Sequence, residues 1–169
     1  KISQFRQRQK PSIFGFFHFI STKNSQPVIE YNEILFGTPD FDEALKLRYE
    51  VLRKPLDMDF VAEDIAKEYI EHCYIATHNA RIVGVIQLKI EGDKAKMRQV
   101  AVDPSLQNQG IGQGLVDYVE KRARELGCSS IFCHARDTAV PFYLKLNYEI
   151  SKEPFEEVGI MHRYMSKIL

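Results

Sequence analysis

The chain has 169 residues, with 23 Lys or Arg against 23 Asp or Glu, and so a formal net charge of zero. This length suits one domain with a single sizeable core. The balanced charge, without a basic stretch interleaved with aromatic residues, argues against nucleic acid as a partner.

The N-terminal segment differs from the rest of the chain. From Lys1 to Ile29 there are five basic residues and no acidic one, and a short apolar run extends from Ile13 to Ile20. That run is too short to span a bilayer, which takes about 20 residues, so we expect no membrane partner. We interpret residues 1–29 as a basic arm that lies on the domain at residues 30–169 or on a neighbouring subunit. A remnant of a targeting segment is the alternative.

The first elements of the domain are a strand and a helix. The run "NEILFG" at residues 32–37 predicts a strand. The run "FDEALKLRYEVLRKP" at residues 41–55 predicts a helix with Thr38 or Asp40 as N-cap. Residues 56–71 indicate a loop and a short second helix.

Three β-rich runs follow within residues 72–104, separated by the short polar connections "HNAR" and "EGDK". They predict an antiparallel meander. The next element is a helix, because apolar residues recur every three or four positions and Gly127 then ends the pattern. The apolar stripe consists of Ile111, Leu115, Val119, Ala123 and Leu126.

The last third of the chain completes the sheet. The run "SSIFCHA" at residues 129–135 indicates a buried strand, and "DTAVPFYLKLNY" at residues 137–148 a short helix with Asp137 or Thr138 as N-cap. Two more extended segments finish the chain. The order of elements indicates an α/β (α+β) fold, with a mixed, mostly antiparallel central sheet of about six to seven strands and helices on both faces.

Glycines open the helix of the 110s in the run "QNQGIGQGL", although glycine costs up to about 1 kcal/mol relative to alanine inside a helix. A helix N-terminus offers unpaired N–H groups and about half a positive charge, and a bare backbone lets a diphosphate approach them. A Walker loop would need Lys-Ser/Thr after Gly112, and a dinucleotide fingerprint would need glycine where Leu115 stands. We therefore predict an anion site between an antiparallel strand and a helix, with a plain turn as the alternative.

The segment at residues 98–127, "RQVAVDPSLQNQGIGQGLVDYVEKRARELG", resembles the central motif of the GNAT superfamily of N-acetyltransferases. Its pattern Gln/Arg-x-x-Gly-x-Gly/Ala is met here, and residues 137–148 are similar to the family's closing helix. The resemblance runs from about Asn32 to the C-terminus. It implies a GNAT-like acyl-CoA N-acyltransferase fold, acetyl-coenzyme A (acetyl-CoA) as cosubstrate, and no metal. By the same resemblance, the main chain would bind the pantetheine arm and thioester at Val100, Ala101 and Val102, and the pyrophosphate at Gln107, Asn108, Gln109, Gly110, Ile111 and Gly112.

The resemblance also implies catalytic roles. Tyr143 matches the family tyrosine that protonates the leaving thiolate, and a phenol with a pKa of about 10 is a reasonable acid toward a thiol of about 8.5. A backbone N–H near Val102 would polarise the thioester carbonyl. His162 is our first candidate for the base, because the ending "GI-x-H" recurs in a similar group of small bacterial acetyltransferases, although Met161 stands where that group has proline. Other candidates for the base are His72, His134, Glu63 and Glu68.

Two positions depart from the family pattern. Asn147 replaces the usual glycine after the last helix, and asparagine is the next-best residue for a left-handed cap. Asp137 stands where many members have an asparagine that contacts the cofactor. A carboxylate there would repel phosphates, so Asp137 either caps the helix or points away. Arg48 and Arg53 are candidates for an acceptor pocket.

The predicted function is transfer of an acetyl group directly to a primary amine of a small molecule or peptide. The three cysteines, Cys73, Cys128 and Cys133, show no CxxC spacing and indicate a reduced, cytoplasmic interior. Alternatives are a ping-pong route through Cys133, a non-catalytic acyl-CoA-binding or sensing module, and a partner-binding protein that uses the arm at residues 1–29. A homodimer is compatible with the sequence.

Overall fold

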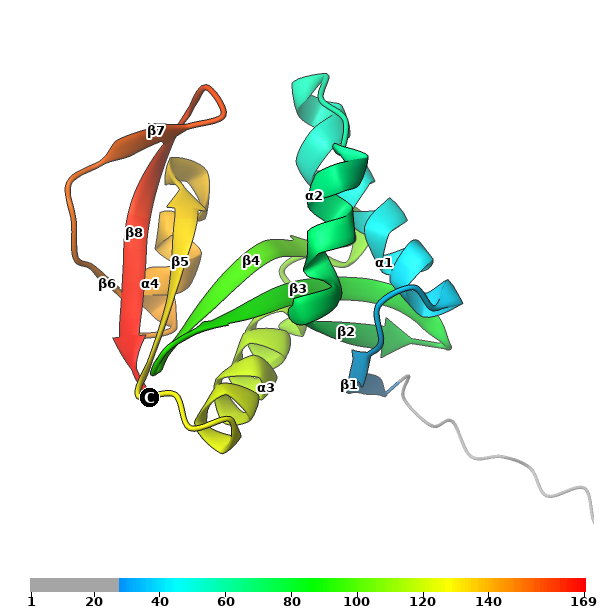
Figure 1. The fold of residues 1–169 in the computed structure, drawn as a ribbon, viewed down its shortest axis with the longest axis horizontal. Helices are drawn as coiled ribbons and strands as arrows, with labels where there is room; N and C mark the ends of the chain where they lie inside the picture. The colour runs from blue at the N-terminus through cyan, green and yellow to red at the C-terminus, as the bar shows by residue number, and fades with distance from the viewer. Residues whose placement is uncertain (1–27) are drawn as a thin grey trace, which may run out of the picture.

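The computed structural model describes residues 28–169, so the predicted arm at residues 1–29 lies almost entirely outside the described part. One eight-stranded sheet runs through the domain in the order β1-β2-β3-β4-β5-β8-β6, and β7 pairs with β8 (Figure 1). The strands are β1 (Ile29–Ile34), β2 (His72–His78), β3 (Arg81–Glu91), β4 (Lys94–Val102), β5 (Ser130–Arg136), β6 (Glu149–Ile150), β7 (Phe155–Glu157) and β8 (Ile160–Ile168). The α-helices are α1 (Pro39–Arg48), α2 (Ala62–Ala66), α3 (Ile111–Glu125) and α4 (Val140–Lys145).

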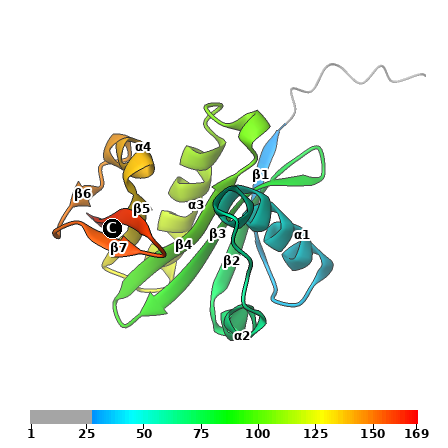
Figure 2. The same cartoon turned by 90° about the horizontal axis from the view of Figure 1, so that it is seen from above.

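Helices cover both faces of the sheet, as predicted. Alternate side chains of β2 point to opposite faces. Cys73 and Ile75 pack with Phe41 of α1, whereas Tyr74 and the α3 side chains belong to the other core cluster. Figure 2 shows the sheet between α1 and α3. The domain therefore has two apolar layers with the sheet between them.

The meander was predicted correctly. β2, β3 and β4 are antiparallel neighbours joined at residues 78–81 and 91–94. The first strand begins at Ile29 rather than Asn32, because its pairing with β2 starts at His78. The sheet has eight strands rather than six to seven, because the extended region before β8 contains both β6 and β7.

The long helix α3 follows its predicted stripe over most of its length. Ile111, Leu115, Val119 and Ala123 are buried, but Leu126 lies at the C-cap and is 40% exposed. Gly127 follows with a φ of +84°, in the left-handed conformation expected after a helix. The stripe therefore buries one turn fewer than the sequence pattern indicates.

The helix predicted at residues 41–55 is shorter and changes its geometry. Thr38 caps α1, accepting a hydrogen bond from the N–H of Phe41. After Arg48 the chain forms a π-helical turn at Tyr49–Arg53 and a 3-10 turn at Lys54–Leu56. Pro55 lacks the N–H that a regular helix would need there. The carbonyl of Leu52 consequently lies in an irregular segment near the end of the sheet.

A buried ion pair ties the end of α1 to the sheet. Both terminal nitrogens of Arg48 donate to the carboxylate of Glu68, at 2.8 and 2.6 Å, and Gln87 of β3 donates to the same carboxylate at 2.9 Å. Their exposed fractions are 0%, 4% and 0%. Arg48 and Glu68, predicted as an acceptor-pocket residue and a base, are instead part of the core.

Removing the carboxylate of this pair should destabilise the fold strongly. In Glu68→Ala the guanidinium of Arg48 stays buried without its partner, and we expect the free energy of unfolding to fall by about 3–5 kcal/mol. The matched control is Glu50→Ala, which breaks the exposed pair with Lys54 and should cost less than about 1 kcal/mol. Urea denaturation measures both. Equal losses in the two variants would show that the buried pair does not hold α1 in place.

Candidate functional site

The site forms where two neighbouring strands separate. β4 and β5 pair in parallel over four residue pairs, from Lys94↔Ser130 to Met97↔Cys133. Beyond that point β5 continues along β8 while β4 stays with β3 (Figure 1). The edge of β4 from Arg98 to Val102 is therefore unpaired on the β5 side within residues 28–169. Its backbone groups are available to a molecule that enters the gap.

A β-bulge shapes this free edge of β4. Val85 pairs with Ala101 and Gln87 with Arg98, so one residue of β3 faces two residues of β4. Gln99 has a φ of +51°, a conformation that few non-glycine residues adopt. Bulges re-aim the side chains beside them. Here the neighbouring Val100 lines both of the cavities described below.

The N-terminus of α3 faces the first cavity, of about 490 Å³. No side chain caps the helix, and the first intrahelical hydrogen bond runs from the N–H of Gly114 to the carbonyl of Gly110. The N–H groups of Ile111, Gly112 and Gln113 therefore have no acceptor inside the helix. No Lys, Arg, Asp or Glu side chain lines this cavity within the described residues. The result is a neutral cradle of backbone donors.

Seven of the nine predicted cofactor-binding residues line this cavity: Val100, Ala101, Val102, Gln107, Asn108, Gly110 and Gly112. The side chain of Gln107 donates to the carbonyl of Val102 at 3.2 Å and so ties the loop to β4. The other two do not line it, because Gln109 faces solvent and Ile111 is only 3% exposed in the core.

Each of the three glycines at the start of α3 is accommodated for a different structural reason. Gly110 is the N-cap and has a φ of +82°. A Cβ at Gly112 would lie 3.5 Å from Val102 and Phe142, an ordinary contact, so this residue leaves the cavity open rather than relieving a clash. A Cβ at Gly114 would collide with the hydroxyl of Tyr31. The third glycine thus serves the packing of β1 on α3 and not the cavity.

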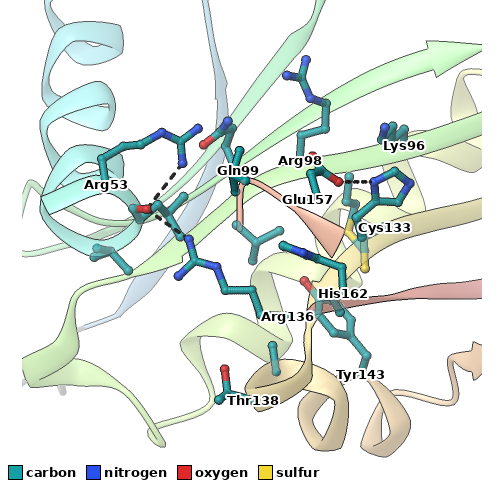
Figure 3. A pocket seen from close by; sticks show the side chains of 18 of the residues that line it. Arg53, Lys96, Arg98, Gln99, Cys133, Arg136, Thr138, Tyr143, Glu157 and His162 are labelled. Carbon is teal, nitrogen blue, oxygen red and sulfur yellow. Dashed lines mark hydrogen bonds and ion pairs between the residues drawn. The ribbon is translucent and has the colours of Figure 1, made fainter. Parts of the chain in front are cut away.

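The second cavity, of about 510 Å³, adjoins the first. Six residues line both: Val51, Val100, Gln107, Thr138, Ala139 and Tyr143. Three residues, Cys133, His134 and His162, line only the second cavity. Figure 3 shows Cys133 and His162 close to Tyr143. The two cavities therefore form one cleft that passes between β4 and β5, with Tyr143 at the junction.

Tyr143 and Cys133 form a buried pair in this cleft. Tyr143 is 4% exposed and Cys133 is 2% exposed, and both line the second cavity. Burial raises the pKa of Tyr143 well above its ordinary value, and the neighbouring Cys133 adds to the shift. Burial also raises the pKa of Cys133 to about 12. At neutral pH the phenol is a proton donor and the thiol is not a thiolate.

His162 reaches the cleft from β8 with a defined tautomer. Its Nδ1 lies 2.8 Å from the carbonyl oxygen of Ile160, and its side chain is 6% exposed. A carbonyl only accepts, so Nδ1 carries the hydrogen and Nε2 of the neutral ring is the acceptor. Phe155 of β7 stacks near-parallel to the ring at 6.0 Å between centroids. His162 is thus held with one basic nitrogen available.

The other candidates for the base are less favourably placed. His134 lines the cleft, but its Nδ1 lies 2.7 Å from the carboxylate of Glu157. His72 pairs with Glu33 of β1 and lies outside both cavities. Glu63 is exposed on α2 and lines neither cavity.

The geometry around α4 shows what Asp137 and Asn147, the two departures from the family pattern, do in the fold. Asp137 is exposed, accepts from Nε of Arg163 at 3.0 Å and lines neither cavity, so it points away from the cleft. It does not cap α4, because a 3-10 turn at Asp137–Ala139 precedes that helix and neither Asp137 nor Thr138 makes a capping hydrogen bond. Asn147 has a φ of +64°, so the predicted left-handed cap is confirmed.

Sequence reasoning missed several polar residues of the second cavity. Arg53 was predicted as an acceptor-pocket residue and lines this cavity. Four further charged residues of the lining were not predicted: Lys96, Arg98, Arg136 and Glu157. One signal was present, since Arg136 stands directly between the predicted buried strand and the closing helix. Neither a metal-binding group nor a helix long and apolar enough to cross a membrane is found within residues 28–169.

Comparisons with known proteins agree on one family. The family description "Acetyltransferase (GNAT) domain" matches residues 39–169. YyaT, an uncharacterized protein of Bacillus subtilis, is 31% identical over 132 residues, which cover 76% of this chain and 88% of YyaT. YjcF of the same organism, an uncharacterized N-acetyltransferase, is 28% identical over 74% of this chain and 90% of its own. A GNAT family acetyltransferase from Elizabethkingia anophelis, solved with acetyl-CoA bound, superposes with a TM-score of 0.65 at 21% identity, covering 83% of this chain and 98% of that one.

Cys133 should be inert toward alkylation. With a pKa of about 12, its thiolate is scarce at pH 8, and we expect its reaction with iodoacetamide to be on the order of a thousand times slower than that of an open thiol. Because the shift is upward, the rate should keep rising with pH and should not level off near pH 9. Peptide mass spectrometry resolves the rate at each cysteine, and the unfolded protein is the control. Fast labelling that levels off near pH 7 would reveal an activated thiolate.

Proposed function

Because the chain belongs to the GNAT family of acetyltransferases, we propose that it moves the acetyl group of acetyl-CoA directly to the primary amine of an acceptor. As a member of this family it is an acyltransferase that depends on acetyl-CoA. The observation that carries the proposal is the single cleft between β4 and β5, with backbone donors in the first cavity, Tyr143 at the junction and His162 in the second cavity.

The residues present fit this cosubstrate. A diphosphate needs donors and no opposing carboxylate, and the first cavity supplies the free N–H groups of Gly112 and Gln113 in a neutral lining. An extended pantetheine arm can hydrogen-bond like a strand, and the free edge of β4 at 98–102 offers such groups. We therefore assign the first cavity to the diphosphate and the β4 edge to the arm and thioester.

Bound acetyl-CoA would supply a thioester whose carbonyl carbon forms a bond to the amine nitrogen as its bond to sulfur breaks. Tyr143 would give its proton to that sulfur, because the phenol is protonated at neutral pH and lies where the two cavities meet. An N–H of β4 near Val102 would stabilise the oxyanion. Cys133 would take no covalent part, since its pKa of about 12 leaves it a thiol.

His162 would accept the proton that the amine loses. Its Nε2 is the free acceptor of the ring, because Nδ1 donates to the carbonyl of Ile160. The residue lines the second cavity together with Tyr143. Amine attack and thiolate departure would therefore be served by two different side chains in one cleft.

Three finer points are proposals. The acceptor is a small molecule or a peptide amine, as the cavity of about 510 Å³ admits either a small amine or one side chain. Three free, buried cysteines fit a reducing, cytoplasmic location. A homodimer is the third proposal, and the molar mass of the protein in solution would test it.

Filling the diphosphate cavity should weaken coenzyme A binding without unfolding the protein. A leucine at position 112 would extend into that cavity, since a Cβ there makes only ordinary contacts at 3.5 Å. We expect Gly112→Leu to weaken coenzyme A binding at least tenfold by calorimetry, with little change in Tm. The control Lys121→Leu places the same side chain on the exposed face of α3 and should bind normally. Normal binding by Gly112→Leu would contradict the assignment.

Thiol release from acetyl-CoA across a panel of primary amines tests the reaction itself. Tyr143→Phe should lower kcat by roughly 10²–10⁴-fold, the usual range for a lost general acid, with coenzyme A affinity unchanged. His162→Ala should lose a similar factor and recover part of it when imidazole is added, which a purely structural role would not allow.

Coenzyme A binding without thiol release from any amine, together with no effect of Tyr143→Phe, would identify a non-catalytic acyl-CoA-binding module instead.

A further inference from the structure

The second cavity is strongly cationic. Arg53, Lys96, Arg98 and Arg136 line it, against the single carboxylate of Glu157. Arg98 is already paired with Glu71, and Glu157 with His134. The three remaining cations form no ion pair with any carboxylate of residues 28–169. The first cavity, in contrast, has no charged side chain in its lining.

Two of these cations converge on one point of the cleft. Arg53 from the turn after α1 and Arg136 from the end of β5 both donate to the carbonyl oxygen of Leu52, at 3.4 and 3.0 Å (Figure 3). Each guanidinium has five N–H donors, and this contact uses one of them. Both side chains are half-buried. Most of their donors are thus free to bind a further acceptor.

The convergence is electrostatically unfavourable as it stands. Burial lowers the pKa of Arg53, and the nearby guanidinium groups of Arg48 and Arg136 lower it further. Half-buried like charges without a counter-charge destabilise a fold, and such charges are ordinarily paired. An anion between Arg53 and Arg136 would remove this cost. Planar guanidinium groups bind carboxylate and phosphate oxygens in a two-pronged geometry.

We propose that the acceptor amine carries a carboxylate or phosphate group, which Arg53 and Arg136 bind. The inference rests on the proposed acetyl transfer and names the class of its acceptor. Lys96, which lies over the ring of Phe132 at 5.8 Å, adds positive charge to the same cavity.

The pairing of β5 with β8 places this anion site beside the proposed base. Arg136 is the direct cross-strand partner of His162, and such partners have Cβ atoms about 4.5–5.5 Å apart. An acceptor whose acid group sits on Arg136 would therefore hold its amine near Nε2 of His162 when the two groups are a few bonds apart. Amino acids and amino phosphates of that kind fit; polycationic amines would be repelled.

The cations also favour the reactive form of the amine. A positive environment lowers the pKa of a bound ammonium group, because the like charge disfavours the protonated form. The neutral amine is the nucleophile. The acid group of the acceptor would thus provide binding, while the excess positive charge of the cavity would assist deprotonation by His162.

Anion binding can be measured without turnover. We would saturate the protein with coenzyme A, which occupies the diphosphate site, and titrate glutarate, inorganic phosphate and neutral glutaramide by calorimetry. The wild type should bind glutarate or phosphate but not glutaramide. Which of the two anions binds more tightly shows whether the site prefers a carboxylate or a phosphate group. Arg53→Gln/Arg136→Gln should bind the anion at least tenfold more weakly, Arg136→Lys should be intermediate, and the exposed-face control Arg124→Gln should match the wild type.

Steady-state kinetics test the inference independently. The acceptors are compared in matched pairs, an amine that carries a free acid group and the same amine with that group converted to a carboxamide. The acid should have the higher kcat/KM, and Arg53→Gln/Arg136→Gln should raise the KM for the acid at least tenfold while the KM for acetyl-CoA is unchanged. Absence of anion binding in the coenzyme-saturated wild type, or equal use of acid and carboxamide, overturns the inference while leaving acetyl transfer intact. Failure of coenzyme A itself to bind would instead overturn the proposed function.

Discussion

The separation of β4 from β5 is the feature on which the rest of the site depends. The two strands share only four residue pairs, up to Met97↔Cys133, before β8 takes over the pairing of β5. A continuous sheet would have used the edge of β4 internally and left no room between the strands. The separation exposes backbone donors and acceptors in the middle of a domain, where a ligand rather than water can pair them. It also brings Tyr143 of α4 and His162 of β8 to one cleft.

The cleft is divided electrostatically along its length. At the start of α3 it is lined by neutral groups, and the attraction for an anion comes from backbone N–H groups alone. Toward β8 it is lined by Arg53, Lys96 and Arg136, whose charge is not balanced by the protein. A diphosphate and the acid group of an acceptor would therefore find different chemistry at the two ends. The neutral junction at Val100 and Tyr143 is where the reacting atoms would meet.

Sequence patterns predicted the elements that depend on local periodicity and failed where long-range contacts decide. The meander, the α3 stripe as far as Ala123 and the left-handed Asn147 follow from spacing and turn chemistry and are confirmed. Gln99 has no local signal, because its positive φ is imposed by the register between β3 and β4. The burial of Arg48 could not be predicted from the pattern of its helix, because it depends on an ion pair with Glu68, twenty residues away. The glycine at position 114 has no local signal either, because its small size makes room for the hydroxyl of Tyr31 on β1.

A crystal structure of the coenzyme A complex tests the central claim most directly. The account predicts the diphosphate at the N–H groups of Gly112 and Gln113, the pantetheine arm along the free edge of β4, and the sulfur within hydrogen-bonding reach of the Tyr143 hydroxyl. A diphosphate bound between Arg53 and Arg136, or an arm that leaves the gap between β4 and β5 empty, would contradict it.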